Sequence, residues 1–281
     1  MSDAAHLAAI ERRDLKFDLS DCDMIRWHPA GAHVSQFYNA LSLLFPEGEK
    51  FFMDSVRHYR NRIQDPGLAE QVRGFIGQEA MHSREHISYN RALRAAGLPA
   101  EKLEAGVRWR LNLGRRLFSP RAQLAITIAL EHFTAIMADA LLSDSRTLEG
   151  APAKLTALWR WHAIEETEHK SVAFDVYREV AGGGLGAYLV RVLMMLHVSL
   201  HFWFEVHRNL WHLARAAGIA GSPRGWLKYL HYQFVRPGPM RRIMPQYFAY
   251  FRPGFHPWDR DNRRHVEQWK ARYHATGEPP A

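Results

Sequence analysis

Glutamate and histidine recur at helical spacings in apolar stretches of this sequence. His162, Glu166 and His169 lie at positions i, i+4 and i+7 within "WRWHAIEETEHKSVAFDVY", and therefore on one face of a helix. Glu79 and His82 form a second Glu-x-x-His pair within "FIGQEAMHSREHISYN". Imidazole and carboxylate together are typical ligands of iron or manganese, with zinc as the alternative. The spacing therefore indicates metal chemistry.

Two more glutamates lie in apolar stretches. Glu131 falls within "AITIALEHFTAIMADALL", and Glu49 shares a helical face with Phe52, Met53 and Val56. An ionised carboxylate is costly in such surroundings unless it is paired or binds a cation. Both residues therefore join the candidate metal ligands.

Together these residues have the pattern of a carboxylate-bridged two-metal site. In such bundles two helices each provide a Glu and two others each provide Glu-x-x-His. Two divalent cations would neutralise four carboxylates. The predicted ligands are Glu49, Glu79, His82, Glu131, His162, Glu166 and His169.

Some neighbouring residues have more than one interpretation. Glu165 and Glu47 are each either a ligand or a residue that supports one, and Glu47 lies nearer its helix start, where the helix dipole favours a carboxylate. His86 is a ligand, a residue that supports one or a core histidine. His162 could also donate a hydrogen bond to a ligating carboxylate instead of binding metal. A single Glu-x-x-His arises by chance, so the prediction depends on the whole set. No His-Glu-x-x-His motif occurs, which argues against a zincin-type protease.

The helices that must position these residues follow from periodicity and from Pro and Gly breaks. The ligand helices are expected over about 46–60, 68–96, 120–142 and from "EGAPAKLTALW" to Val180, with another helix over 32–44. Strand signals are scarce. The Glu-to-Glu spacings of 30, 52 and 35 residues suit two hairpins joined by one long crossover. We predict an all-α chain: a ferritin-like four-helix bundle with additional N-terminal and C-terminal helices.

The chain divides into three segments within one structural domain. Residues 1–30 read as a lead-in, 31–180 as the metal-binding bundle and 181–281 as a C-terminal helical extension that begins at the linker "AGGGLG". The tail "QYFAYFRPGFHPWDRD" is expected to pack around the bundle, and its His256 is a weak candidate for any chemistry.

The helix expected over 187–215 has a polar stripe at His197, His201, Glu205, Arg208 and His212. The favoured interpretation is an amphipathic helix on the bundle with this stripe towards water. Peripheral membrane contact through 187–215 and a stripe that faces a substrate channel are the alternatives.

Composition restricts location and partners. The net charge is +8, yet the sequence shows no nucleic-acid-binding motif, so we expect a basic soluble protein that does not bind nucleic acid. The lone Cys22 excludes an internal disulfide and a multi-cysteine metal site. The N-terminus lacks a signal-peptide pattern, so we expect a cytoplasmic location. A homodimer remains open.

Several stretches resemble a known bacterial family. "EAMHSREHISYNR", "EHFTA", "WRWHAIEETEHKSVAFDVY" and "RPGFHPW" are similar to the family of predicted metal-dependent hydrolases. The ligand pattern also resembles ferritin-like di-iron proteins, above all the arylamine N-oxygenase (p-aminobenzoate N-oxygenase) branch, where an extra His precedes the last Glu-x-x-His. This resemblance implies two irons bound by the seven predicted ligands, with His162 as the extra His. His86 and the long C-terminal region depart from that branch.

Three functions follow as hypotheses. The first is an O2-dependent oxidase or oxygenase that acts on a hydrophobic or aromatic small molecule. The second is hydrolysis by metal-activated water, which the family label favours. The third is non-catalytic iron handling, although the extra His and the long extension do not suit a minimal ferritin subunit.

Overall fold

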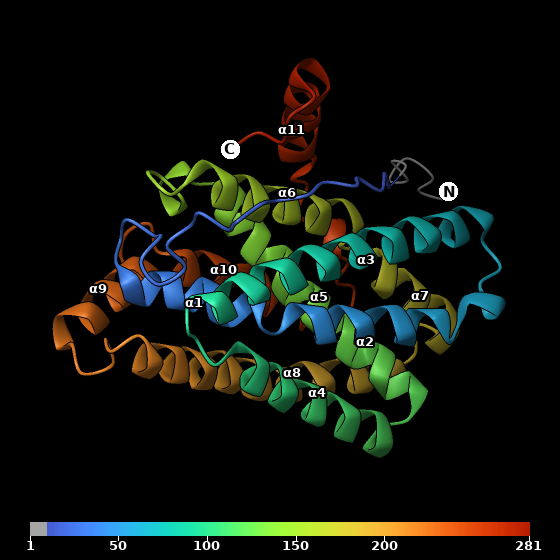
Figure 1. Cartoon of the computed structure of the whole chain (residues 1–281). Helices are drawn as coiled ribbons and strands as arrows, with labels where there is room; N and C mark the ends of the chain where they lie inside the picture. The colour runs from blue at the N-terminus through green and yellow to red at the C-terminus, as the bar shows by residue number, and fades with distance from the viewer. Residues whose placement is uncertain (1–9) are drawn as a thin grey trace.

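All regular secondary structure in the part of the chain that the structure describes is helical. This structure is a computed structural model, and it describes residues 10–281, in which no strand occurs (Figure 1). The predicted all-α class is confirmed. The first nine residues of the predicted lead-in lie outside the described range.

Four helices enclose the interior of the bundle. Helix α2 packs on α3, α3 on α6, α6 on α5, and α5 on α2, which closes the ring. The crossover helix α4 lies against α2 and α3. This agrees with the predicted two hairpins and one long crossover. The bounds are α2 Phe45–Arg57, α3 Pro66–Ala95, α4 Ala100–Leu117, α5 Pro120–Leu142 and α6 Ala153–His169.

Local sequence signals fix where two of the ligand helices begin. Asp65 precedes α3, and its side chain accepts a hydrogen bond from the backbone N–H of Gly67. Ser119 precedes α5 and accepts from the N–H of Ala122. Each cap is followed by Pro at the first helical position, where no N–H is needed. These starts set which residues of α3 and α5 face the interior.

The predicted helix that runs to Val180 is wrong in one respect, because it is broken after His169. Helix α6 ends there, and α7 spans Val172–Ala181. Lys170 at the break is buried, and its ammonium donates to Arg260 O and Asn262 Oδ1 in the C-terminal segment. These partners lie about 90 residues further along the chain, so helical periodicity does not reveal them.

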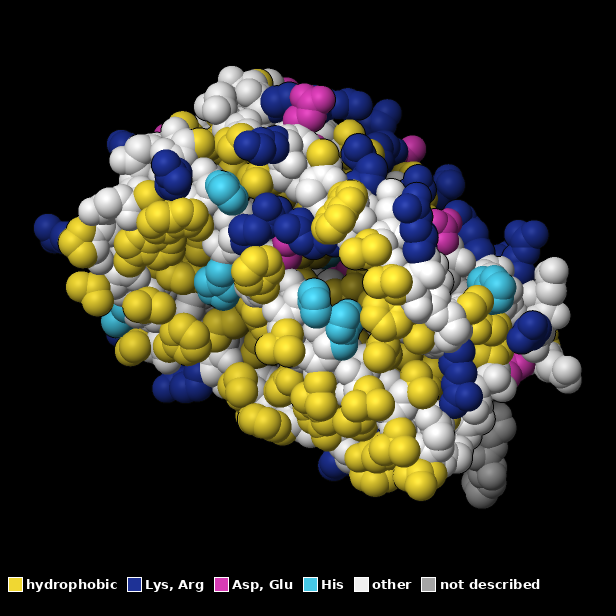
Figure 2. All heavy atoms as spheres, turned by 90° about the horizontal axis from the view of Figure 1, so that it is seen from below, with side chains coloured by type: hydrophobic (Ala, Val, Ile, Leu, Met, Phe, Trp, Pro, Cys, Tyr) yellow, Lys and Arg dark blue, Asp and Glu magenta, His cyan; other side chains and the backbone are white. Residues whose placement is uncertain are grey.

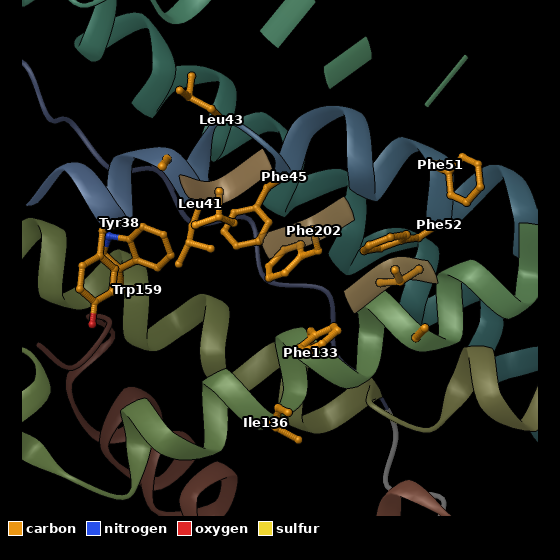
Figure 3. Packing of buried hydrophobic residues seen from close by; sticks show 14 of the residues in the cluster. Tyr38, Leu41, Leu43, Phe45, Phe51, Phe52, Phe133, Ile136, Trp159 and Phe202 are labelled. Atoms are coloured by element: carbon orange, nitrogen blue, oxygen red, sulfur yellow. The ribbon is translucent and has the colours of Figure 1, made fainter. Parts of the chain in front are cut away.

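The lead-in crosses the outside of α3 and α6 (Figure 1). The backbone N–H of Phe17 donates to Glu85 Oε2 on α3, at 2.9 Å. One cluster of buried apolar side chains extends from Phe17 to Trp269 and so includes all three predicted segments. Figure 3 shows part of it, where Phe45, Phe52, Phe133 and Phe202 from three helices gather in one layer.

The remaining helices cover the bundle. Helix α8 packs on α1 and α5, α10 on α5 and α9, and α11 on α6. In the aromatic tail, His256 Nε2 lies 3.0 Å from Asp175 Oδ1 on α7, which agrees with a packing role. The bounds are α1 Ala32–Ser42, α8 Leu185–Ala216, α9 Pro223–Phe234, α10 Pro239–Ala249 and α11 Arg263–Thr276.

Two helices, α5 and α8, have the length and hydropathy of a membrane span, but they differ in burial. The most apolar window of α5 is 83% buried, so this helix belongs to the core. The corresponding window of α8 is only 28% buried. Leu193, Leu200 and Phe204 on α8 are exposed, and Figure 2 shows hydrophobic side chains spread over this face of the molecule.

The polar stripe of α8 does not simply face water. His197, His201 and Glu205 line a cavity between α8 and α4. Glu205 is buried, which agrees with the channel alternative and contradicts the water-facing interpretation for this residue. His201 and His212 are exposed, as the water-facing interpretation predicts. The sequence pattern could not decide this, because a stripe that faces a cavity and one that faces solvent have the same periodicity.

Candidate metal centre

The seven predicted ligands meet inside the bundle. Helix α2 provides one, α3 two, α5 one and α6 three, and each side chain belongs to a residue that is at most 4% exposed. The structure therefore brings together the whole set that the spacing selected: Glu49, Glu79, His82, Glu131, His162, Glu166 and His169.

Glu166 lies at the middle of this cluster and presents one oxygen to each side. Its Oε1 is 3.0 Å from Nε2 of His162 and 3.6 Å from Nδ1 of His82. Its Oε2 is 3.6 Å from Nε2 of His169. The rings of His82 and His162 are stacked with centroids 4.2 Å apart. A carboxylate with a separate imidazole group at each oxygen has the geometry of a bridge between two metal positions.

The other three carboxylates differ in how closely they approach the histidine nitrogens. Ligand atoms of Glu79, Glu166 and His169 lie within 4.8 Å of one another, as do those of Glu49, Glu79 and His82. Glu79 Oε1 is 3.1 Å from His169 Nε2. Glu131 is more remote, with Oε2 3.7 Å from the same nitrogen. It belongs to none of these close groups.

Burial and mutual repulsion perturb the carboxylates strongly. Burial, with repulsion from neighbouring carboxylates, raises the pKa values of Glu49, Glu79 and Glu131 well above their usual range. Burial would also raise the pKa of Glu166, but contacts with His162 and His169 lower it well below that range. Without further positive charge, the cluster therefore opposes full ionisation.

The histidines respond in opposite ways. Burial, together with the neighbouring His162, lowers the pKa of His82 well below its usual range. Burial also acts to lower the pKa of His169, but the Glu166 and Glu131 carboxylates outweigh it and raise that pKa to about 9. A proton on His169 thus takes the place that a cation would occupy between these carboxylates.

The unpartnered atoms of the cluster fit a pair of divalent cations. Both oxygens of Glu79 and of Glu131 are buried without a hydrogen-bond partner, as are Nε2 of His162 and Nε2 of His169. Unpaired buried polar atoms are costly, and such atoms converging from three helices indicate a missing counter-charge. Two divalent cations would balance the four carboxylates and satisfy these atoms.

His86 has protein partners at both ring nitrogens. Its Nε2 is 2.8 Å from Nδ1 of His162, and its Nδ1 is 2.9 Å from Oγ of Ser42. Ser42 Oγ in turn donates to Asn90 Oδ1, because the Asn90 amide nitrogen donates to Ser42 O and to Glu104 Oε1. The hydroxyl proton is therefore engaged, and Ser42 Oγ accepts from His86.

This chain of hydrogen bonds fixes the proton on His162. Because Nδ1 of His86 donates to Ser42, its Nε2 is the acceptor for the Nδ1–H of His162. The lone pair of His162 Nε2 then points to Glu166 Oε1 and the cluster. We infer that His86 supports His162 rather than binding metal itself, which is one of its three predicted interpretations.

Gln78 fixes His169 in the same manner. Its amide nitrogen donates to Glu168 Oε2 at 2.7 Å, so its Oε1 is free to accept from Nδ1–H of His169 at 2.9 Å. The other ring nitrogen, Nε2, then faces the carboxylates. Gln78 directly precedes a predicted ligand in sequence, but nothing in the residue pattern distinguishes it from an ordinary polar residue.

The flanking Glu165 and Glu168 connect the cluster to both ends of the described chain. Glu165 Oε2 lies 3.0 Å from Nε2 of His82. The buried guanidinium of Arg13 donates to Glu165 Oε1 and to both oxygens of Glu168. Lys270 of α11 lies 2.6 Å from Glu168 Oε1. Sequence reasoning missed Arg13 and Lys270, because neither lies in a periodic stretch with the ligands.

Burial and charge set the two flanking carboxylates apart. Burial raises the pKa of Glu165 to about 8, although Arg13 opposes the shift. Burial acts in the same direction on Glu168, but Arg13 and Lys270 outweigh it and lower its pKa. Glu47, the remaining candidate, is not brought to the cluster. It is partly exposed and pairs with Arg108 at 2.5 Å, in the first turn of α2.

The sequence profile of one family matches nearly all of the chain. Residues 11–261 match the profile described as predicted metal-dependent hydrolase. The chain belongs to this family. No curated protein and no solved structure matched the chain in the same comparisons. Membership of a metal-dependent family agrees with the His and Glu groups inside the bundle, whereas the likeness to ferritin-like proteins and arylamine N-oxygenases stays a prediction.

The bridging position of Glu166 gives a test by metal content. After loading with Fe(II) and desalting, we expect about two metals per wild-type chain and fewer than about one in Glu166→Ala, because both positions lose a ligand. Glu47→Ala is the matched control and should keep about two. Elemental analysis measures the ratio, and two metals in Glu166→Ala would contradict the assignment of Glu166 as a bridge.

Glu131→Gln tests the most remote ligand through stability. The raised pKa of Glu131 means that its ionised form destabilises the metal-free fold as pH rises through that pKa. At pH 8 in EDTA, the variant should therefore be as stable as wild type or more stable. Mn(II) at 100 times Kd should stabilise wild type by about 2.7 kcal/mol for each metal bound, and the variant by less. Thermal and urea unfolding measure both, and an undiminished metal effect would remove Glu131 from the ligand set.

His86→Leu tests the hydrogen-bond chain. The variant leaves Nδ1–H of His162 without its acceptor, so metal affinity should fall about 10- to 100-fold. His86→Gln, which retains an acceptor, should recover part of the loss, and His58→Leu at an exposed position should have no effect. Competition with a chelating dye measures affinity. Equal affinity in His86→Leu and wild type would show that His86 does not support the site.

Proposed function

We propose that the chain is a two-metal enzyme that uses O2 to oxidise a hydrophobic small molecule, with iron as its metal. The apolar surroundings of the cluster support this proposal. A cavity of about 60 Å³ reaches His162 and Glu166, and its walls include Leu41, Trp159 and Met240. The part of a substrate that lies beside the cluster must therefore be largely apolar.

The hydroxyl groups in this wall already have partners, whereas Nε1 of Trp159 has none. Beside the two ligands, the described residues place three hydroxyls there, from Tyr38, Thr134 and Thr147. Thr134 donates to Glu131 O and Thr147 to Leu141 O, while Tyr38 shares a hydrogen bond with Tyr232. Hydrolysis needs groups that stabilise an oxyanion and protonate a leaving group. The three hydroxyls are engaged elsewhere, which favours a reaction that requires neither an oxyanion donor nor a leaving-group acid from them.

The ligand set suits iron in an oxidative reaction. When bound, two Fe(II) ions would supply electrons to O2. Four carboxylates and three histidines provide hard oxygen and imidazole ligands, and the negative charge of the carboxylates stabilises the more highly charged ferric state. His86 and Gln78 hold His162 and His169 with a free nitrogen towards the cluster, and the closely packed bundle excludes water.

Hydrolysis is the second candidate function, because the family description names it. There the two metals would activate water for attack on an ester or amide. Iron handling without catalysis explains the ligands but gives no reason for an apolar cavity at His162 and Glu166. From the arylamine N-oxygenases we take no substrate, since the resemblance is confined to the ligand pattern.

Stopped-flow mixing with O2 separates these functions. Metal-free protein is loaded with two equivalents of Fe(II) without oxygen and then mixed with O2-saturated buffer. We expect a visible absorption band that forms and decays, with uptake of about one O2 per iron pair, the stoichiometry of a dinuclear site. Glu166→Ala should show neither change, and Glu47→Ala should react as wild type does.

The same preparations test the second candidate. Wild type loaded with Zn(II) or Mn(II) is assayed against 4-nitrophenyl esters and amides. Ester hydrolysis that requires the metal and is lost in Glu166→Ala, together with no absorption change and no O2 uptake by the Fe(II) form, would overturn the oxidative proposal in favour of hydrolysis.

A further inference from the structure

We propose that the cavity between α2, α4, α5 and α8 binds the apolar chain of an anionic amphiphile, with the anionic group at Arg110 and the apolar chain near the metal cluster. This cavity is separate from the small one at His162, and its volume is about 400 Å³. That volume is within the range of small-molecule binding sites.

The walls of this cavity are apolar along most of their length. Helix α2 contributes Phe51 and Phe52, α5 contributes Leu130, and α8 contributes Val198 and Phe202. Phe52 and Phe202 lie in the aromatic layer of Figure 3. Such a wall offers an unbranched hydrocarbon chain contact on several sides but gives a polar ligand almost nothing to bind.

Two residues of the cavity wall lie next to the metal cluster. Phe45 and Thr134 line both this cavity and the small one that reaches His162 and Glu166. The Phe45 ring lies 4.7 Å from the ring of His162, centroid to centroid. Thr134 follows Glu131 by three residues and donates to its backbone oxygen. A chain that fills the cavity therefore comes within one side chain of the cluster.

One part of the cavity wall carries positive charge. Arg110 of α4 and Arg208 of α8 both contact the carboxylate of Glu205, at 3.2 Å and 2.5 Å. Two guanidinium groups thus share one carboxylate, which leaves one positive charge uncompensated. His197 and His201 line the same cavity, with ring centroids 4.1 Å apart. The guanidinium groups favour a carboxylate or phosphate group.

The charged part of the cavity wall lies at the surface of the protein. The Arg110 side chain is about one-third exposed and His201 is exposed. Figure 2 shows a hollow on this face with histidine and basic side chains at its rim and hydrophobic side chains around them. An amphiphile can therefore enter with its chain first and keep its charged group at the rim.

This inference extends the proposed function, because it names the class of molecule that would lie beside the metals. Binding itself does not require metal. The test therefore uses metal-free protein, so that binding and the O2 reaction can succeed or fail independently of each other.

Dodecanoate, below its micellar concentration, is the probe for the chain. Isothermal titration should show binding of dodecanoate and none of butanoate. Gly114 lines the cavity, and a side chain there has room to enter it. Gly114→Leu should weaken dodecanoate binding about tenfold, as expected from excluding two methylene groups from apolar contact. Gly186→Leu, at an exposed helical position with open space around it, is the matched control and should bind as wild type does.

Dodecanol is the probe for the charged group. Arg110→Gln should weaken dodecanoate about tenfold or more, as expected from losing a charge-assisted hydrogen bond, and leave dodecanol unchanged. Arg116→Gln, an exposed change on the same helix, should affect neither ligand. Circular dichroism of all four variants verifies the fold.

Each outcome decides one part of the proposal. Equal dodecanoate affinity in wild type and Gly114→Leu overturns the cavity as the binding site, and so does a dimer that covers this face and prevents binding. If Arg110→Gln weakens the binding of dodecanoate and dodecanol equally, Arg110 does not bind the anionic group. Retained binding with no reaction of the Fe(II) form towards O2 would refute the proposed function alone.

Discussion

Burial of like charges beside imidazoles is the constraint on which the rest of this structure depends. Four carboxylates and three histidines share this buried interior, where the pKa values of Glu79 and His169 are raised and the pKa of His82 is lowered. Two divalent cations would remove most of this repulsion. The closed ring of α2, α3, α5 and α6 brings the groups together, so the fold and the metal chemistry have the same physical basis.

Hydrogen bonds around the cluster determine which ring nitrogen of each supported histidine faces it. A histidine can bind metal through either ring nitrogen, and a partner at one nitrogen decides which lone pair is free. The chain from Asn90 through Ser42 and His86 does this for His162, and Gln78 does it for His169. Both therefore face the cluster before any metal arrives, which lowers the cost of organising the site.

The gathering of the seven candidate ligands could be predicted because each lies in a helix with strong periodicity, and the spacing within α3 and α6 puts Glu and His on one face. The break after His169 could not, since it coincides with a buried Lys170 whose partners are remote in sequence. The same holds for Arg13 and for the orientation of the α8 stripe. Interactions within one helix can be predicted from the local sequence, whereas interactions between distant segments depend on how the helices pack in the folded protein.

Glu168 has a consequence for the order of events during synthesis. Its carboxylate is held from one side by Arg13 and from the other by Lys270, and it anchors Gln78, which orients His169. Arg13 leaves the ribosome early and Lys270 more than 250 residues later. This support for His169 is therefore completed only when nearly all of the described chain has been made. Until then the nascent bundle has its carboxylates and imidazoles but lacks Lys270, the last partner of Glu168.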